Sequence, residues 1–251
     1  MASRLRLMDM DGCRAVGRRA LRTISFREEG AKLNIWMALI NLAYSESKNS
    51  GADSAVYRDA LSTVVRKACA LAHPKLIRLR VAAMYEEAGD ASAAEAAYAE
   101  AATKHKKSKK VWVAFIRFQL LIKQDAKSAS ELVGRALSCT AQHKHLYIIS
   151  RYAQDEFSGG SIERGRTIFE ELIARYGAKR ADIWNVYIDR EVQNGQFEAA
   201  RTLFARLTSL NTGTKAAKSS FKKWLVFEEK HGDTRSRRQV KDKARNWVRD
   251  K

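Results

Sequence analysis

The stretch DIWNVYIDRE, residues 182–191, decides the fold because its apolar residues recur at three- and four-residue spacing. At this spacing Trp184, Tyr187 and Glu191 fall near one face of a helix. The register returns along the chain, and its first positions are 43, 33, 37, 35 and 37 residues apart. Its copies are Trp36/Leu39/Ala43, Leu79/Ala82/Glu86, Trp112/Phe115/Gln119, Ile149/Tyr152/Glu156, Trp184/Tyr187/Glu191 and Phe221/Trp224/Glu228. Such a period predicts a stack of two-helix units rather than one globular core.

A second helix signature follows the first one in several units. Gly165 opens GRTIFEEL, and Ala200 opens ARTLFARL 35 residues later, while residues 94–101 and 130–137 are related to both. The small first residue lets this helix approach its neighbour closely. The aromatic residue four positions later is then expected to fill the space between units.

A glycine followed by a polar residue separates the two signatures in four units. These glycines are Gly89, Gly160, Gly195 and Gly232. We expect each glycine to close the first helix in the left-handed conformation. Asp90, Ser161 and Asp233 are expected to cap the second helix, because their side chains accept hydrogen bonds from free backbone N–H groups.

The repeats predict one non-repeat segment and one repeat domain. Residues 1–10 form the segment, and residues 11–251 form the domain, which begins with an unpaired helix at 11–24. The expected helix pairs are 32–72, 75–105, 109–139, 143–176, 181–210 and 215–249. A single proline in 251 residues suits such long helices.

Composition excludes a disordered or membrane-spanning chain. The sequence is 45% hydrophobic and 30% charged, which allows a substantial core. Its most apolar stretch, residues 111–122, is too short to cross a bilayer, so we expect no membrane partner. Cys13, Cys69 and Cys139 lie far apart in expected helices. They predict reduced, mostly buried thiols in an intracellular protein.

The charge balance favours an acidic partner. Lys and Arg number 47 against 28 Asp and Glu, for a net charge of +19. From residue 215 onward the chain has 13 basic and 5 acidic residues. A basic surface of this size suits nucleic acid or an acidic protein.

Two groups of basic residues are the candidate contacts for RNA or an acidic partner. One is a lysine-rich loop, which is also interpretable as a nuclear import signal or as an ordinary solvated loop. It comprises Lys104, Lys106, Lys107, Lys109 and Lys110. The other lies in the last helix pair, where a solubilising cap is the alternative interpretation. It comprises Lys218, Lys222, Lys223, Arg235, Arg238, Lys241, Arg245 and Arg249.

The repeated aromatic and acidic residues are expected to be structural. Trp and Tyr at helical spacing on an apolar face indicate a core rather than platforms for stacking bases. Glu156, Glu191 and Glu228 recur once per repeat, so they are expected to pair with basic residues between helices. His143 and His145 do not share a helix face, and no metal site is expected. No catalytic motif occurs, so we expect no enzyme, cofactor or small-molecule substrate.

The two signatures together resemble half-a-TPR repeats, which implies an all-α, right-handed superhelical solenoid. Longer segments are similar, in order and spacing, to the C-terminal repeat domain of the ribosomal RNA-processing protein five family, called programmed cell death protein eleven in animals. The segments span residues 19–29, 32–36, 143–145, 163–166, 182–189 and 221–233. The resemblance runs from about residue 11 to the end of the sequence.

This resemblance implies a nucleolar scaffold of the small-subunit processome that supports pre-ribosomal RNA cleavage and production of 18S rRNA. Its implied partners are ribosome-assembly proteins and pre-ribosomal RNA. The S1 RNA-binding domains of that family are not found in this sequence, and the first repeat lacks its first helix. Two alternatives stay open: an RNA-binding module acting alone, and a half-a-TPR scaffold of mRNA 3′-end processing or splicing.

Overall fold

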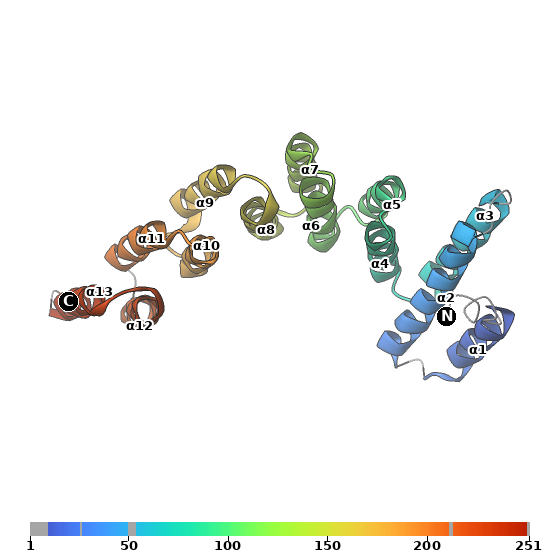
Figure 1. Ribbon diagram of the computed structural model, residues 1–251, viewed down its shortest axis with the longest axis horizontal. Coiled ribbons are helices and arrows are strands. Elements are labelled where there is room, and N and C mark those ends of the chain that lie inside the picture. The colour runs from blue at the N-terminus through green and yellow to red at the C-terminus, as the bar shows by residue number, and fades with distance from the viewer. Residues whose placement is uncertain (1–9, 26, 50–53, 211–212, 250–251) are drawn as a thin grey trace. The chain divides into compact units, whose positions relative to one another are not determined.

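The computed structural model describes residues 10–25, 27–49, 54–210 and 213–249, which form helices and short connections (Figure 1). No strand occurs within these ranges, and neighbouring helices pack in pairs. The predicted all-α solenoid of helical repeats is confirmed, while its right-handed path stays a prediction. Of the expected non-repeat segment 1–10, only Met10 lies within the described residues, and it begins the first helix.

The helices fall into two compact units, residues 1–141 and 142–251, so the single repeat domain stays a prediction. The first unit contains α1 Met10–Thr23, α2 Glu29–Asn49, α3 Ser54–Leu71, α4 Pro74–Glu87, α5 Ala91–Lys104, α6 Lys109–Arg117, η3 Phe118–Ile122 and α7 Ala126–Cys139. The second contains η4 Gln142–Lys144, α8 His145–Gly159, α9 Ile162–Tyr176, α10 Ala181–Gln193, α11 Phe197–Ser209, α12 Thr214–His231 and α13 Thr234–Arg249.

Within each unit, every pair consists of a first and a second helix that pack together. The pairs are α2 with α3, α4 with α5, α6 with α7, α8 with α9, α10 with α11 and α12 with α13. The helix α1 packs on α2. In α7 the sequence pattern placed the small first residue of the second signature at Ser130. The structure buries Ala129 and exposes Ser130, so the signature begins one residue earlier than predicted.

Aromatic side chains join the second helix of one pair to the first helix of the next. Phe169 on α9 stacks on Tyr187 on α10, with ring centroids 4.9 Å apart. Phe204 on α11 stacks on Trp224 on α12 at 5.8 Å. Most of the signature positions therefore lie in the core. The buried aromatic ones are Trp36, Trp112, Phe115, Tyr152, Trp184, Tyr187, Phe221 and Trp224.

Indole N–H groups also tie two inter-pair loops to the core. Trp112 Nε1 donates to the carbonyl of Lys106 at 2.7 Å, and Trp184 Nε1 donates to the carbonyl of Gly177 at 3.2 Å. Each tryptophan thus satisfies its polar atom while its ring stays buried. These bonds fix the entry into the first helix of a pair.

The glycine prediction is correct at two of the four turns. Gly89 and Gly195 have φ of +74° and +71°, whereas Gly160 and Gly232 have φ of −100° and −114°. The left-handed assignment is wrong for the latter two. A Cβ there would collide with Oε2 of a buried glutamate four residues earlier, so close approach demands glycine.

The predicted helix caps are confirmed. Asp90 Oδ1 accepts from the N–H of Ala93, and Ser161 Oγ accepts from the N–H of Arg164. Asp233 Oδ1 accepts from the N–H of Ser236 at 2.7 Å.

A cap that the glycine pattern missed lies in the third pair. Asp125 Oδ1 accepts from the N–H of Ser128 at 2.9 Å. The residue before it is Gln124, which takes φ of 55° where other turns have glycine. In this pair the first signature residue, Trp112, lies 12 residues before the turn residue Gln124. The corresponding separation to the turn glycine is 11 residues in α8, α10 and α12. The π-helical turn η3 accommodates the additional residue.

The cysteine burial prediction is wrong. Cys13 and Cys139 are exposed, Cys69 is half-buried, and all three are free thiols. Helical spacing placed them in helices, but it did not place them on the packed faces.

We predict that Trp184→Ala lowers the free energy of unfolding by about 3–5 kcal/mol, as removal of a buried aromatic side chain does. Trp184 is 2% exposed and also lies against the Arg206 guanidinium. Trp112→Ala should have a similar effect, since that ring is equally buried. Urea unfolding followed by circular dichroism measures both.

Two matched variants complete this test. Trp184→Phe keeps a ring but loses the indole hydrogen bond, and should cost about 1 kcal/mol, less than the alanine variant. Val248→Ala, at an exposed site, should change stability by less than about 0.5 kcal/mol. A loss at Trp184→Ala no larger than that at Val248→Ala would contradict the core assignment.

Candidate interaction surface

Buried carboxylates join neighbouring helix pairs in the second unit. Arg166 on α9 forms a bidentate pair with Glu191 on α10, with N–O distances of 2.8 and 2.9 Å. Arg201 on α11 pairs in the same way with Glu228 on α12. Both glutamates are almost fully buried. The repeated glutamate and the arginine after the small residue of the second signature are thus partners in space.

Where the arginine is absent, the partner changes. Ser130 occupies the arginine position in α7, and Glu156 pairs instead with Arg164 of its own helix pair. In α5 the position holds Glu95, whose carboxylate accepts from Gln119 at 2.7 Å and from Lys123 at 2.6 Å. Here the acid lies on the second helix of a pair, and its donors belong to the first helix of the next pair and the residue after it. The acid and the donor have therefore changed places relative to the second unit.

Electrostatics support a structural role for Glu228. Burial raises the pKa of its carboxyl, but hydrogen bonds from Arg201, Trp224 and Ser236 outweigh burial, so the pKa lies below its ordinary value. The same pair raises the pKa of the Arg201 guanidinium. Glu228 therefore stays ionised at neutral pH, with its oxygens already occupied by donors. The Glu228 carboxylate therefore serves packing.

The lysine-rich loop lies between α5 and α6 in the first unit. The hydrogen bond from Trp112 to the carbonyl of Lys106 holds its backbone. The side chains of Lys104, Lys106, Lys107 and Lys110 are exposed, while Lys109 is half-buried. Burial lowers the pKa of His105 in this loop, and the charges of nearby Arg78 and Lys75 lower it further.

The lysines of α12 lie on its exposed side. Lys218, Lys222 and Lys223 are all exposed. The last two line a groove of about 500 Å³ between α10 and α12, together with Lys230. Lys230 was not among the residues predicted from the sequence.

The predicted basic face of α13 points away from the core. Val240 is the buried residue of this helix, and Arg238, Lys241, Arg245 and Arg249 lie on the opposite side. Asp242 lies within the same face, 3.2 Å from Arg245 and 4.0 Å from Arg238. Asp242 therefore reduces the net charge of this face. The sequence pattern singled out only the basic residues of this face and not Asp242.

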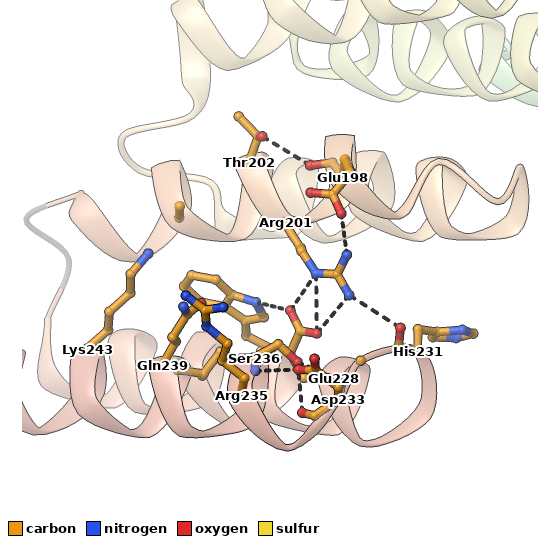
Figure 2. Close-up of a pocket in the computed structure, with 14 residues that line it drawn as sticks. Glu198, Arg201, Thr202, Glu228, His231, Asp233, Arg235, Ser236, Gln239 and Lys243 are labelled. Carbon is orange, nitrogen blue, oxygen red and sulfur yellow. Dashed lines mark hydrogen bonds and ion pairs between the residues drawn. The ribbon is translucent and has the colours of Figure 1, made fainter.

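A separate cleft of about 640 Å³ is lined by α11, α12 and α13. Figure 2 shows Arg201 reaching from one side of this cleft to Glu228, with Arg235 and Lys243 on α13. The ammonium of Lys243 lies 4.9 Å from the centroid of the Trp224 ring. Lys243 is a further basic residue that the sequence pattern did not single out.

The structure does not bring all predicted basic residues of the last pair together. Lys222 and Lys223 line the groove beside α10, and Arg235 lines the cleft beside α11. The outer face of α13 lines neither of these. Most of the predicted basic residues of the last pair are thus divided among the groove, the cleft and the outer face of α13.

Neither a metal site nor a membrane span is found in the part of the chain that the structure describes. No group of three His, Cys, Asp or Glu residues there is arranged to hold a metal ion. No helix there is long and apolar enough to cross a membrane.

The fold and these surfaces define a helical-repeat protein with a basic exterior. Over 248 residues, 99% of the chain, it is 38% identical to the rRNA biogenesis protein rrp5 of Schizosaccharomyces pombe. Over the same share it is 36% identical to the rRNA biogenesis protein RRP5 of Arabidopsis thaliana. The whole chain therefore corresponds to one domain of RRP5-family proteins. It spans 14% and 12% of the length of these two relatives.

Two further comparisons concern family models and a splicing factor. No protein-family model matches the chain. The pre-mRNA-splicing factor CLF1 of Debaryomyces hansenii is 30% identical over 105 residues, which is 39% of the chain and 15% of that protein. The likeness to a splicing factor is thus confined to part of the repeats.

We predict that Glu228→Gln lowers the free energy of unfolding by about 2–4 kcal/mol at neutral pH, because it removes the buried counter-charge of the partly buried Arg201 guanidinium. Glu198→Gln is the matched control. Glu198 pairs with the same arginine, but its side chain is 88% exposed, so its removal should cost less than about 1 kcal/mol. Equal losses in the two variants would contradict the structural role of the buried pair.

The same variant has a defined pH dependence. The folded-state pKa of Glu228 lies below the ordinary value of 4.5, so its contribution is present above that pH and is lost as the pH falls through the folded-state pKa. The stability difference between wild type and Glu228→Gln should therefore narrow on acidification below about pH 4.5. Urea titrations at several pH values measure it, and a constant difference would contradict the assignment.

Proposed function

We propose that the chain is a non-catalytic scaffold of ribosome biogenesis that acts in early assembly of the small subunit. One observation carries the proposal: the similarity over 99% of the chain to proteins named for rRNA biogenesis. On this proposal it supports the pre-ribosomal RNA processing that yields 18S rRNA. Its place of action is the nucleus, in the nucleolus.

The mechanism is geometric. Buried aromatic layers hold each unit rigid, and buried Arg–Glu pairs add to this in the second unit, while the basic regions remain available to partners. The partners are assembly proteins and pre-ribosomal RNA. The lysine-rich loop and the outer face of α13 meet phosphates, because exposed lysine and arginine side chains there can displace counter-ions. The interior aromatic rings take no part in binding, since they are covered.

A second candidate is a scaffold of mRNA splicing, which the partial similarity to CLF1 favours. That similarity covers 39% of the chain, against 99% for the relatives named for rRNA biogenesis. The ribosomal function therefore ranks first. The RNA that co-purifies with the tagged chain separates the two: pre-ribosomal RNA supports the first candidate, and spliceosomal RNA supports the second.

We predict that replacing Arg238, Lys241, Arg245 and Arg249 together by glutamine weakens binding to a pre-ribosomal RNA transcript. The slope of log K against log salt should fall by about 2–3, since each phosphate that the protein neutralises adds roughly 0.7 to it. Filter binding over a salt series measures both quantities. The helical content and melting temperature should stay unchanged, because these side chains are exposed.

The control removes the same charge elsewhere. Arg18, Arg19, Arg22 and Lys67 are exposed residues of the first unit, and their joint replacement by glutamine should change the slope far less. Equal effects of the two quadruple variants would show that only net charge matters. Absence of RNA binding by the wild-type chain at low salt would exclude an RNA partner and leave protein scaffolding.

A further inference from the structure

The groove between α10 and α12 has an apolar floor. Ile188 and Val192 contribute from α10, Phe204 from α11, and Phe227 from α12. Val226 stands on the α12 side and is 43% exposed, which is unusual for a valine of a packed helix pair. The groove thus offers aliphatic and aromatic surface to a side chain that enters it.

Its two sides differ in charge. Lys222, Lys223 and Lys230 line the α12 side, and none of the three forms an ion pair within the described residues. Asn185 and Asp189 line the α10 side. A ligand that fits both sides therefore carries negative charge toward α12 and hydrogen-bond donors toward α10.

We propose that this groove binds an acidic segment of a partner protein, which inserts a large apolar side chain between α10 and α12. The carboxylates of the segment pair with the three lysines, and its backbone N–H groups face Asn185 and Asp189. The apolar side chain covers Val226 and rests on the floor. This inference deepens the proposed scaffold function, on which it rests, by assigning a protein partner of stated chemistry to one site.

The lining favours a protein segment over RNA. Base stacking needs an accessible aromatic face. Phe204 is stacked on Trp224, and Phe227 packs against both Phe204 and Phe197, so both rings are almost fully buried. The carboxylate of Asp189 would also repel a phosphate backbone on the opposite side. An apolar anchor flanked by carboxylates matches the floor and the lysines together.

The neighbouring cleft of Figure 2 fits such a ligand less well. Its acidic lining residues, Glu198, Glu228 and Asp233, balance its cations Arg201, Arg235 and Lys243. The guanidinium of Arg201 is already engaged by Glu198 and Glu228. The groove between α10 and α12 therefore provides the net positive charge that an acidic segment requires.

Fluorescence anisotropy with two labelled peptides tests the inference. The probe is EEDLFDEE, and EEDSSDEE has the same charge without the apolar anchor. Wild-type protein should bind the probe about tenfold more tightly than the serine peptide. Lys222→Glu/Lys223→Glu and Val226→Asp should each weaken binding of the probe about tenfold or more. All of these positions are exposed, so the variants should fold, which circular dichroism checks.

The control variant Lys179→Glu/Lys215→Glu makes the same charge change at exposed residues outside the groove and should bind the probe like wild type. Three results would overturn the inference: no binding of the probe, equal binding of both peptides, or equal losses in groove and control variants. Loss of oligouridine binding in Val226→Asp would assign the groove to RNA instead. RNA binding through α13 is measured separately, so failure of the peptide test leaves the proposed function standing.

Discussion

Stacking of Phe169 on Tyr187, and of Phe204 on Trp224, fixes how one helix pair meets the next in the second unit. At both junctions an aromatic ring of the second helix stacks on an aromatic ring of the following first helix. The small residues Gly165 and Ala200 allow the close approach. The Arg166–Glu191 and Arg201–Glu228 pairs then bridge the same junctions, so each junction is both packed and hydrogen-bonded.

The buried aromatic stacks and Arg–Glu pairs determine which side chains stay exposed to partners. Because the repeated tryptophans and the glutamates Glu156, Glu191 and Glu228 are buried inside the units, partners meet the exterior, which is rich in lysine and arginine. The outer face of α13, the groove beside α12 and the lysine-rich loop each expose such residues on a firm backbone. On the proposed function, this combination of fixed geometry and salt-dependent attraction to polyanions serves a scaffold of ribosome assembly. The basis of that proposal is the similarity over 99% of the chain to a protein named for rRNA biogenesis.

Much of the fold was predictable from the sequence, because the helix signatures and caps are local patterns. The repeated aromatics were correctly placed in the core, and Asp90, Ser161 and Asp233 cap helices as expected. Gly160 and Gly232 were misassigned because the reason for glycine is a buried carboxylate nearby, which spacing alone does not reveal. The groove was not predicted at all. Its walls come from α10 and α12, which the whole of α11 separates in sequence, and its shape depends on the distance between two helix axes.

If exposed basic residues bind RNA while the repeated aromatic residues form the buried core, only peptides with the exposed basic residues should crosslink to RNA. Ultraviolet crosslinking of RNA to the tagged chain in cells, followed by mass spectrometry of the crosslinked peptides, measures that difference most directly. We expect crosslinks to small-subunit pre-ribosomal RNA in peptides of α13 and the lysine-rich loop. Crosslinks concentrated on Trp112, Trp184 or Trp224, or confined to RNA unrelated to the ribosome, would contradict this division of roles.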